Sequence, residues 1–190
     1  MFFRFASCLL LVVLFSAAVN AQTSSPPACG TDTHCSEMGA LVARQFGPGF
    51  TLLPEFKPLL GDLDSDGQED AVIVATAAKP LADAEQFQYK VLDPYDSYFG
   101  WGDPRVTAAF EPTYTGARRF VLVVHAWQAA TPKAKFVIIN LPFEKLSLSR
   151  LQLKKKKTVL AISALESSYT ASATYWDGSR YRWRPDYVNE

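Results

Sequence analysis

The chain carries no excess of charge of either sign. Its 190 residues include 19 Lys and Arg and 19 Asp and Glu, so the formal net charge at pH 7 is zero. A nucleic-acid-binding domain needs a basic surface, and a protein held electrostatically on an anionic membrane needs an excess of Lys and Arg. The balanced charge therefore argues against nucleic acid as a partner and gives no support for electrostatic membrane binding.

Residues suited to catalysis or zinc binding are also scarce. The sequence contains two histidines, His34 and His125, and it has no Gly-x-Ser-x-Gly sequence, zinc-ligand spacing or glycine-rich phosphate loop. We therefore expect a non-catalytic protein, and we interpret His125, which follows an apolar run, as a hydrogen-bonded histidine within a sheet. Two carboxylates brought together only by folding would leave no motif, so the enzyme alternative stays open.

The longest apolar run lies near the N-terminus. Arg4 precedes the apolar residues 9–15, and small residues follow up to Ala21. A positive residue, an apolar segment and a small-x-small site in this order are typical of a signal peptide. The apolar segment is shorter than the roughly 20 residues that span a bilayer. We expect cleavage after Ala21, a secreted or periplasmic product and no transmembrane segment after signal removal.

The remaining chain has the length of one domain. We predict a signal peptide over residues 1–21, a flexible lead-in over 22–32 and a single globular domain over 33–190. Two cysteines follow the predicted cleavage site, Cys29 and Cys35. In an oxidising compartment such a close pair favours a disulfide that ties down the mature N-terminus.

Hydrophobic periodicity predicts one helix followed by strands. Apolar residues recur at helical spacing over 33–45, and Gly47-Pro48 ends the pattern. The predicted strands cover residues 71–75, 86–92, 120–124, 136–139 and 159–165. No long helical pattern separates them, which disfavours parallel βαβ units. We expect an α+β fold, mostly β: an antiparallel sheet with one N-terminal helix packed on it.

The C-terminal sequence predicts a β-hairpin. Residues 170–176 and 180–184 flank Asp177-Gly178, a pair that favours the positive φ angles of a tight turn. The alternation of side chains along the two strands places three aromatic residues on one side: Trp176, Tyr181 and Trp183. We expect this aromatic side to face the core.

An acidic loop is the strongest chemical feature. Residues 61–70 read Gly-Asp-Leu-Asp-Ser-Asp-Gly-Gln-Glu-Asp, and Gly67 permits the sharp turn that inward-facing carboxylates need. Calcium takes about six to eight oxygen ligands. We predict a Ca²⁺ site whose ligands are Asp62, Asp64, Asp66, Gln68 through its backbone carbonyl, and Asp70. An EF-hand is disfavoured, because its twelfth position is a Glu and this chain has Ile73 there.

Residues 61–74 resemble the calcium loop of FG-GAP/VCBS-type repeats, in which Asp-x-Asp-x-Asp-Gly-x-x-Asp leads directly into an apolar strand. The resemblance implies side-chain ligation by the four aspartates named above, ligation by the Gln68 carbonyl and an extracytoplasmic setting. The loop occurs once in the chain. The resemblance therefore does not imply the multi-bladed propeller that these repeats build.

A second, weaker candidate site is an aromatic segment. Tyr95, Tyr98 and Trp101 lie among Gly, Pro and Asp residues, and aromatic residues on loops can stack on sugar rings. Together these features predict a secreted, calcium-stabilised, non-catalytic domain whose partner at the cell envelope is a protein or a glycan. The alternatives are a small secreted hydrolase with a structural calcium ion and an envelope assembly subunit.

Overall fold

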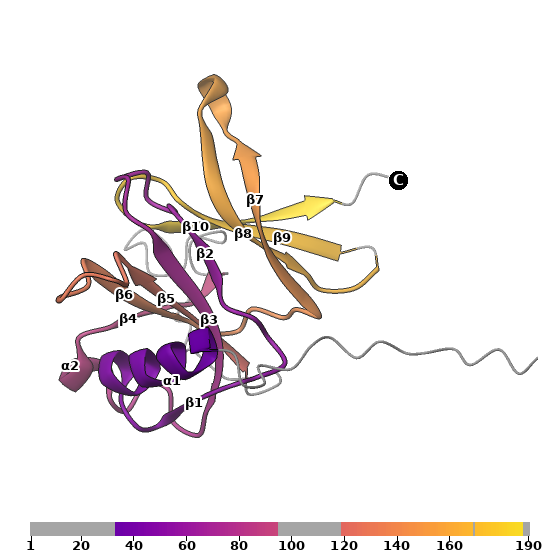
Figure 1. Cartoon of the computed structure of the whole chain (residues 1–190). Coiled ribbons are helices and arrows are strands. Elements are labelled where there is room, and N and C mark those ends of the chain that lie inside the picture. Colours follow the sequence, from indigo (N-terminus) through magenta and orange to yellow (C-terminus); the bar gives the residue numbers. More distant parts are fainter. Residues whose placement is uncertain (1–32, 95–118, 169, 188–190) are drawn as a thin grey trace, which may run out of the picture.

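The computed structural model describes residues 33–94, 119–168 and 170–187. In these ranges two β-sheets and an N-terminal helix form three layers, with the larger sheet in the middle (Figure 1). The helical elements are α1 (Thr33–Phe46), α2 (Ala84–Phe87) and the short 3-10 helix η1 (Lys154–Lys156). The strands are β1 (Phe50–Leu52), β2 (Leu59–Gly61), β3 (Asp70–Ala77), β4 (Lys90–Leu92), β5 (Arg119–His125), β6 (Ala134–Ile138), β7 (Lys145–Gln152), β8 (Thr158–Leu165), β9 (Thr170–Trp176) and β10 (Tyr181–Tyr187).

The strands divide between two sheets. The larger sheet has the order β1-β3-β5-β6-β4, with β2 also pairing with β3, and the smaller sheet has the order β10-β9-β8-β7. The α+β, mostly β class predicted from the sequence is confirmed. The structure differs from the expected antiparallel sheet in detail, since the strands form two sheets and β4 runs parallel to β6. The parallel pair arises because the chain crosses from β4 to β6 by way of β5, which lies on the far side of β6.

The larger sheet is covered on both faces. Along β3, Ile73 packs in the cluster that includes α1, whereas Val72 packs in the cluster shared with the smaller sheet. Along β5, Leu122 and Val123 divide in the same way. A strand buried on both faces has apolar residues at every position. This explains why these two strands are continuous apolar runs instead of alternating ones.

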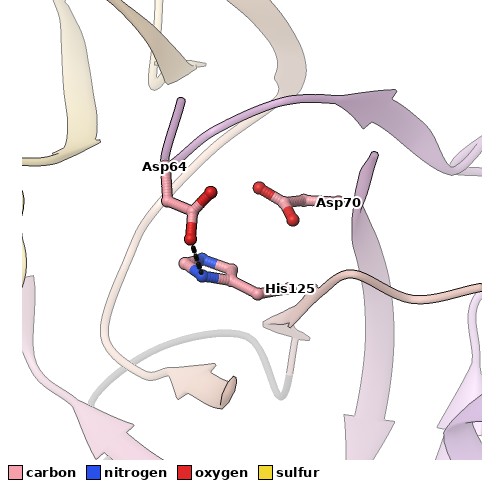
Figure 2. Close-up of side chains that lie close together, drawn as sticks. All are labelled: Asp64, Asp70 and His125. Atoms are coloured by element: carbon pink, nitrogen blue, oxygen red, sulfur yellow. Dashed lines mark ion pairs between the residues drawn. The ribbon is translucent and has the colours of Figure 1, made fainter. Parts of the chain in front are cut away.

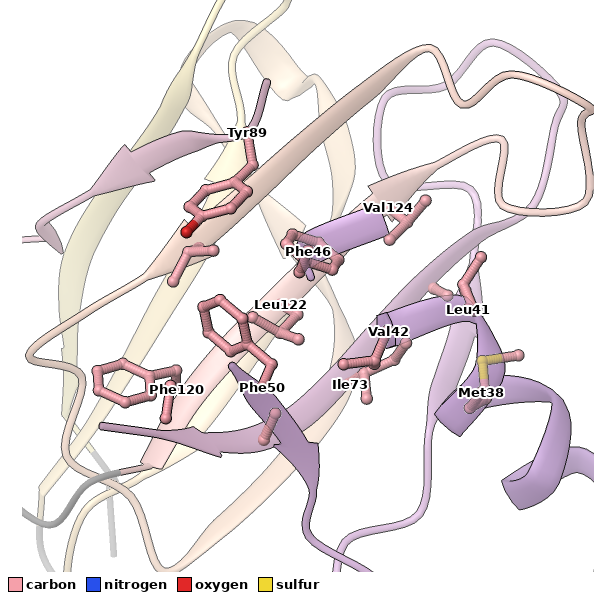
Figure 3. Close-up of a cluster of buried hydrophobic side chains, with 14 of the residues drawn as sticks. Met38, Leu41, Val42, Phe46, Phe50, Ile73, Tyr89, Phe120, Leu122 and Val124 are labelled. Atoms are coloured by element: carbon pink, nitrogen blue, oxygen red, sulfur yellow. The ribbon is translucent and has the colours of Figure 1, made fainter. Parts of the chain in front are cut away.

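Helix α1 covers one face of the larger sheet as the periodicity predicts. Figure 3 shows Met38, Leu41, Val42 and Phe46 directed towards β3 and β5, and all four are buried. The helix ends where Gly47 adopts a left-handed φ of 94° and its amide donates to the carbonyl of Ala43. Neither helix α1 nor α2, nor any other helix in the described ranges, is long and apolar enough to span a membrane.

The strand predicted over residues 86–92 is partly wrong. Its first residues belong to α2, and only β4 is extended. Gln88 ends α2 with a left-handed φ of 55°. Tyr89 then packs its ring against Phe46 and Phe50 and donates its hydroxyl to the carbonyl of Pro80. The alternation of aromatic and polar residues over 86–92 therefore reflects the packing of α2 and the turn after it, and not one continuous strand.

The C-terminal hairpin matches its prediction. Strands β9 and β10 pair with Trp176 opposite Tyr181, and the turn covers residues 177–180. Trp176, Tyr181 and Trp183 all pack against the core between the sheets. Strands β7 and β8 form a second hairpin that extends away from the helix (Figure 1). The lysine-rich segment lies in its turn, with Lys154, Lys156 and Lys157 exposed.

Candidate metal site

Neighbouring strand ends bring an aspartate and a histidine together. Strands β3 and β5 are antiparallel, with Ala71 opposite Val124, so Asp70 begins β3 where His125 ends β5. Because side chains alternate along a strand, Asp70 and His125 lie on the same face as Val72 and Val123, which is the face towards the smaller sheet. Figure 2 shows these two side chains converging with Asp64, which comes from the loop before β3.

Asp70 fixes the backbone around this meeting point. One carboxylate oxygen accepts the amide of Leu63 at 2.7 Å, and the other accepts the amide of Ala126 at 2.9 Å. Burial raises the pKa of Asp70, and the hydrogen bond from Ala126 is the first of several effects that oppose this rise. Asp70 thus holds the loop before β3 against the turn after β5. Its predicted role as a calcium ligand stays a prediction.

His125 is buried and hydrogen-bonded within the sheet, as the sequence predicts. Its ring is 1% exposed, with Nδ1 3.2 Å from Asp64 Oδ2 and Nε2 2.7 Å from the Tyr181 hydroxyl. An ionised carboxylate only accepts hydrogen bonds, so we assign the proton on Nδ1 from this partner. Burial raises the pKa of Tyr181 well above its usual value, with further contributions from Asp70 and Asp64. The Tyr181 hydroxyl therefore keeps its proton and is available to His125.

Residues 62–69, the part of the acidic loop between β2 and β3, are held by hydrogen bonds to side chains of the loop itself. Asp62 accepts the amides of Asp66 and Gly67 at 3.1 and 3.0 Å, one on each carboxylate oxygen. Asp66 in turn accepts the amide of Gln68 at 2.8 Å. Ser65 and Gly67 adopt positive φ angles of 61° and 84°, which give the loop its two tight bends. Each carboxylate oxygen has two lone pairs, so an oxygen that accepts an amide can also bind a cation.

The loop also enters the core. Leu63 is buried between the two sheets and packs with the residues of β3, β5 and β6 that face the smaller sheet. Leu63 lies between Asp62 and Asp64, so the backbone that carries these two aspartates is anchored in the core. Glu69 adds contacts to the turn at residues 126–133, because its carboxylate accepts the Trp127 indole and its carbonyl accepts the Trp127 amide.

Three aspartates of the loop form a cluster that could hold a metal ion. Asp62, Asp64 and Asp66 each offer an oxygen, and these oxygens all lie within 4.8 Å of one another. Calcium–oxygen distances are about 2.3–2.6 Å, so two ligands of one ion are at most about 5 Å apart. The cluster meets this limit. Asp64 belongs also to a second group, with Asp70 and His125, whose ligand atoms likewise lie within 4.8 Å of one another.

One buried oxygen supports the metal interpretation. The Asp64 side chain is only 2% exposed, and its Oδ1 is buried without a hydrogen-bond donor from any residue that the structure describes. A buried carboxylate oxygen without a partner is costly. A metal ion bound by Asp64 could give this oxygen a ligand bond. The donor set of the loop is made up of hard oxygens, which calcium prefers.

A lysine outside the loop also contacts the cluster. Lys133, just before β6, places its ammonium 2.6 Å from Asp64 Oδ2 and 2.8 Å from Asp66 Oδ2. The hydrogen bonds with Asp64 and Asp66 raise the pKa of Lys133. The same contact with Lys133, followed by the Gln68 amide, lowers the pKa of Asp66. Asp66 is therefore ionised at neutral pH, in the state in which it can bind a cation.

Two sets of predicted site residues lie wholly or partly outside the described ranges. The aromatic candidates Tyr95, Tyr98 and Trp101 do so together, and their ligand-binding role stays a prediction. Of the predicted disulfide, Cys35 is described and is buried in α1, whereas Cys29 lies outside, so this pairing also stays a prediction.

Sequence reasoning missed Lys133 and the contact between His125 and the loop. Lys133 follows Thr131-Pro132, and no motif around it indicates a contact with the acidic loop. The contact between His125 and the loop could have been predicted from the sequence. One apolar run begins after Asp70 and another ends before His125, and antiparallel pairing of those runs places the two residues side by side.

Comparisons of the chain with protein-family models, curated proteins and solved structures gave no significant match. The interpretation of the site therefore depends on its geometry alone. An acidic cluster able to bind a metal ion is the part of the resemblance to FG-GAP/VCBS-type repeats that the structure supports.

Proposed function

We propose that this chain is a secreted or periplasmic, non-catalytic domain whose fold is stabilised by calcium bound in the acidic loop. The observation that carries the proposal is the convergence of Asp62, Asp64 and Asp66 with a buried Asp64 oxygen that lacks a hydrogen-bond donor among the described residues. In the proposed site these three side chains and the Gln68 carbonyl bind the ion. The single Asp-x-Asp-x-Asp-Gly-x-x-Asp loop, similar to that of FG-GAP/VCBS-type repeats, supports calcium as the metal.

The contacts of the loop explain how the ion would stabilise the whole fold. Asp64 contacts His125 at the end of β5, and His125 contacts Tyr181 of β10 in the other sheet. Leu63 packs between the same two sheets. An ion that fixes Asp64 therefore fixes a chain of contacts across the core. Binding only to the folded state adds about 2.7 kcal/mol of stability at a calcium concentration one hundred times the Kd.

The hydrolase alternative receives no support from His125. A general base must reach a substrate, but this ring is buried and its two nitrogens contact the Asp64 carboxylate and the Tyr181 hydroxyl. The carboxylates that converge on it, Asp64 and Asp70, come from the predicted calcium loop. We therefore retain the non-catalytic function and, as the class of partner, a protein or a glycan at the cell envelope.

Thermal unfolding of the purified protein in EDTA and in millimolar calcium tests the proposal. At a hundredfold excess over Kd, the midpoint is expected to rise by about 5–10 °C. Asp66→Ala removes a ligand whose side chain lies at the surface end of the cluster, and it should abolish the rise.

Asp83→Ala is the matched control for this experiment. Asp83 precedes α2 and makes no capping hydrogen bond with its side chain. This variant should keep the full response to calcium. An unchanged midpoint of the unmodified protein in calcium, or an equal rise in Asp66→Ala, would refute the proposed role of the loop.

A further inference from the structure

The contact between Lys133 and the acidic cluster has consequences for ion binding. Its ammonium lies within hydrogen-bonding distance of Asp64 Oδ2 and Asp66 Oδ2, two of the carboxylates that the proposed function assigns to calcium. A divalent cation bound by these carboxylates would lie close to the positive charge of the Lys133 ammonium. Like charges this close repel strongly in a partly buried site. The lysine and the ion therefore compete for the same negative charge.

The burial of the partners shows which of them can move. The Asp64 side chain is 2% exposed and is held by His125, whereas the Lys133 side chain is 51% exposed. The backbone of Lys133 is fixed, because its amide donates to the carbonyl of His125 at 3.1 Å. The flexible stem of a lysine can carry its ammonium into water without disturbing the core. Of these partners, Asp64 is therefore the one held in place, whereas the ammonium of Lys133 can move into water.

We propose that Lys133 is a tethered competitor of calcium, which neutralises Asp64 and Asp66 in the ion-free protein and sets the calcium affinity by having to leave them. This inference rests on the proposed function, because it concerns the same site. It gives Lys133 two opposite effects. The lysine stabilises the ion-free fold by offsetting the repulsion between carboxylates, and it weakens calcium binding by the same contacts.

Lys133→Met is the informative variant, since methionine keeps an unbranched apolar stem and removes the charge. Calcium affinity is measured by competition with a chromophoric chelator, and stability by urea unfolding in EDTA. Calcium should bind Lys133→Met about tenfold more tightly than the unmodified protein, given the strength of hydrogen bonds between charged groups. The ion-free variant should unfold at a lower urea concentration.

Two further variants separate charge competition from other effects. Lys145→Met removes the same charge from an exposed position at the start of β7, and it should leave the calcium affinity unchanged. Lys133→Arg keeps the positive charge at the site, and it should keep the affinity within about threefold of the unmodified protein, since Arg makes the same kind of charged contact.

The outcomes distinguish this inference from the proposed function. If the unmodified protein binds calcium and Lys133→Met binds it equally or more weakly, the competitor role is wrong and the calcium site stands. If neither protein binds calcium at millimolar concentration, the proposed function and this inference both fail. A tenfold gain in Lys133→Met that Lys145→Met and Lys133→Arg do not share supports the inference.

Discussion

The hydroxyl of Tyr181 offers a sharp test of the contacts that join the loop to the smaller sheet. Tyr181→Phe removes one oxygen and keeps the ring, which packs against Phe136 and Trp176 with centroid separations of 5.0 and 5.2 Å. The lost hydrogen bond to His125 Nε2 is 2.7 Å long, and the residues at both ends are 1% exposed. The change therefore leaves a buried ring nitrogen without its partner.

The magnitude follows from this burial. Leaving a buried polar group unpaired costs about 1–3 kcal/mol, so we expect a loss of about 2 kcal/mol in the free energy of unfolding. For a domain of this size the midpoint of thermal unfolding should fall by about 4–8 °C. Urea unfolding in EDTA is the suitable assay, because it measures the ion-free protein and is independent of calcium.

Tyr175→Phe provides the matched control. Tyr175 lies on β9, with its side chain on the opposite face of the smaller sheet from Tyr181, and it is half-buried. Its hydroxyl makes no hydrogen bond to any side chain or backbone group of the described residues. This substitution should change the free energy of unfolding by less than about 0.5 kcal/mol. Equal losses in the two variants would refute the account of His125 as a buried residue that depends on Tyr181.

Two other substitutions test the anchoring of the loop and the C-terminal turn. Asp70→Asn replaces one of the two carboxylate acceptors with an amide donor that faces the amide of Leu63 or of Ala126. The free energy of unfolding in urea should therefore fall by about 3 kcal/mol. A loss below about 1 kcal/mol would contradict the anchoring role of Asp70. Burial raises the pKa of Asp177, but hydrogen bonds from Arg182, Arg180 and Ser179 outweigh this and hold the pKa well below 3.8. The ionised form therefore stabilises the fold above pH 3.8, and this contribution is lost as the pH falls towards the lowered value. Asp177→Ala should cost about 1 kcal/mol at pH 7 and progressively less in acid, whereas a difference that does not vary with pH would show that the charge has no part.

Much of the fold follows from local patterns in the sequence. The spacing of Met38, Leu41 and Val42 predicts α1 because a helix needs only an apolar stripe and an end signal, and both lie within the same short segment. The β9–β10 hairpin is predictable for the same reason, since its turn and its aromatic face are local. The division of the strands between two sheets is not predictable in this way, because the residues of a strand do not specify which strand it pairs with.

The contacts of the candidate site are likewise of two kinds, local ones that the sequence predicts and long-range ones that it does not. Asp62, Asp64 and Asp66 are close in the chain, so their convergence is predictable from the loop alone. Lys133 reaches the loop only through the pairing of β5 with β6, and Tyr181 reaches His125 only through the packing of the two sheets. Contacts of this kind depend on the register between distant segments, and a single sequence gives no measure of that register.

The central claim is that the acidic loop binds calcium, and equilibrium dialysis followed by elemental analysis tests it most directly. The purified protein and the Asp66→Ala variant are dialysed against free calcium from micromolar to millimolar concentrations. The account predicts saturation at a single ion per chain for the unmodified protein and no saturable binding for the variant. Equal calcium contents in the two proteins, or none bound by the unmodified protein at millimolar calcium, would contradict it.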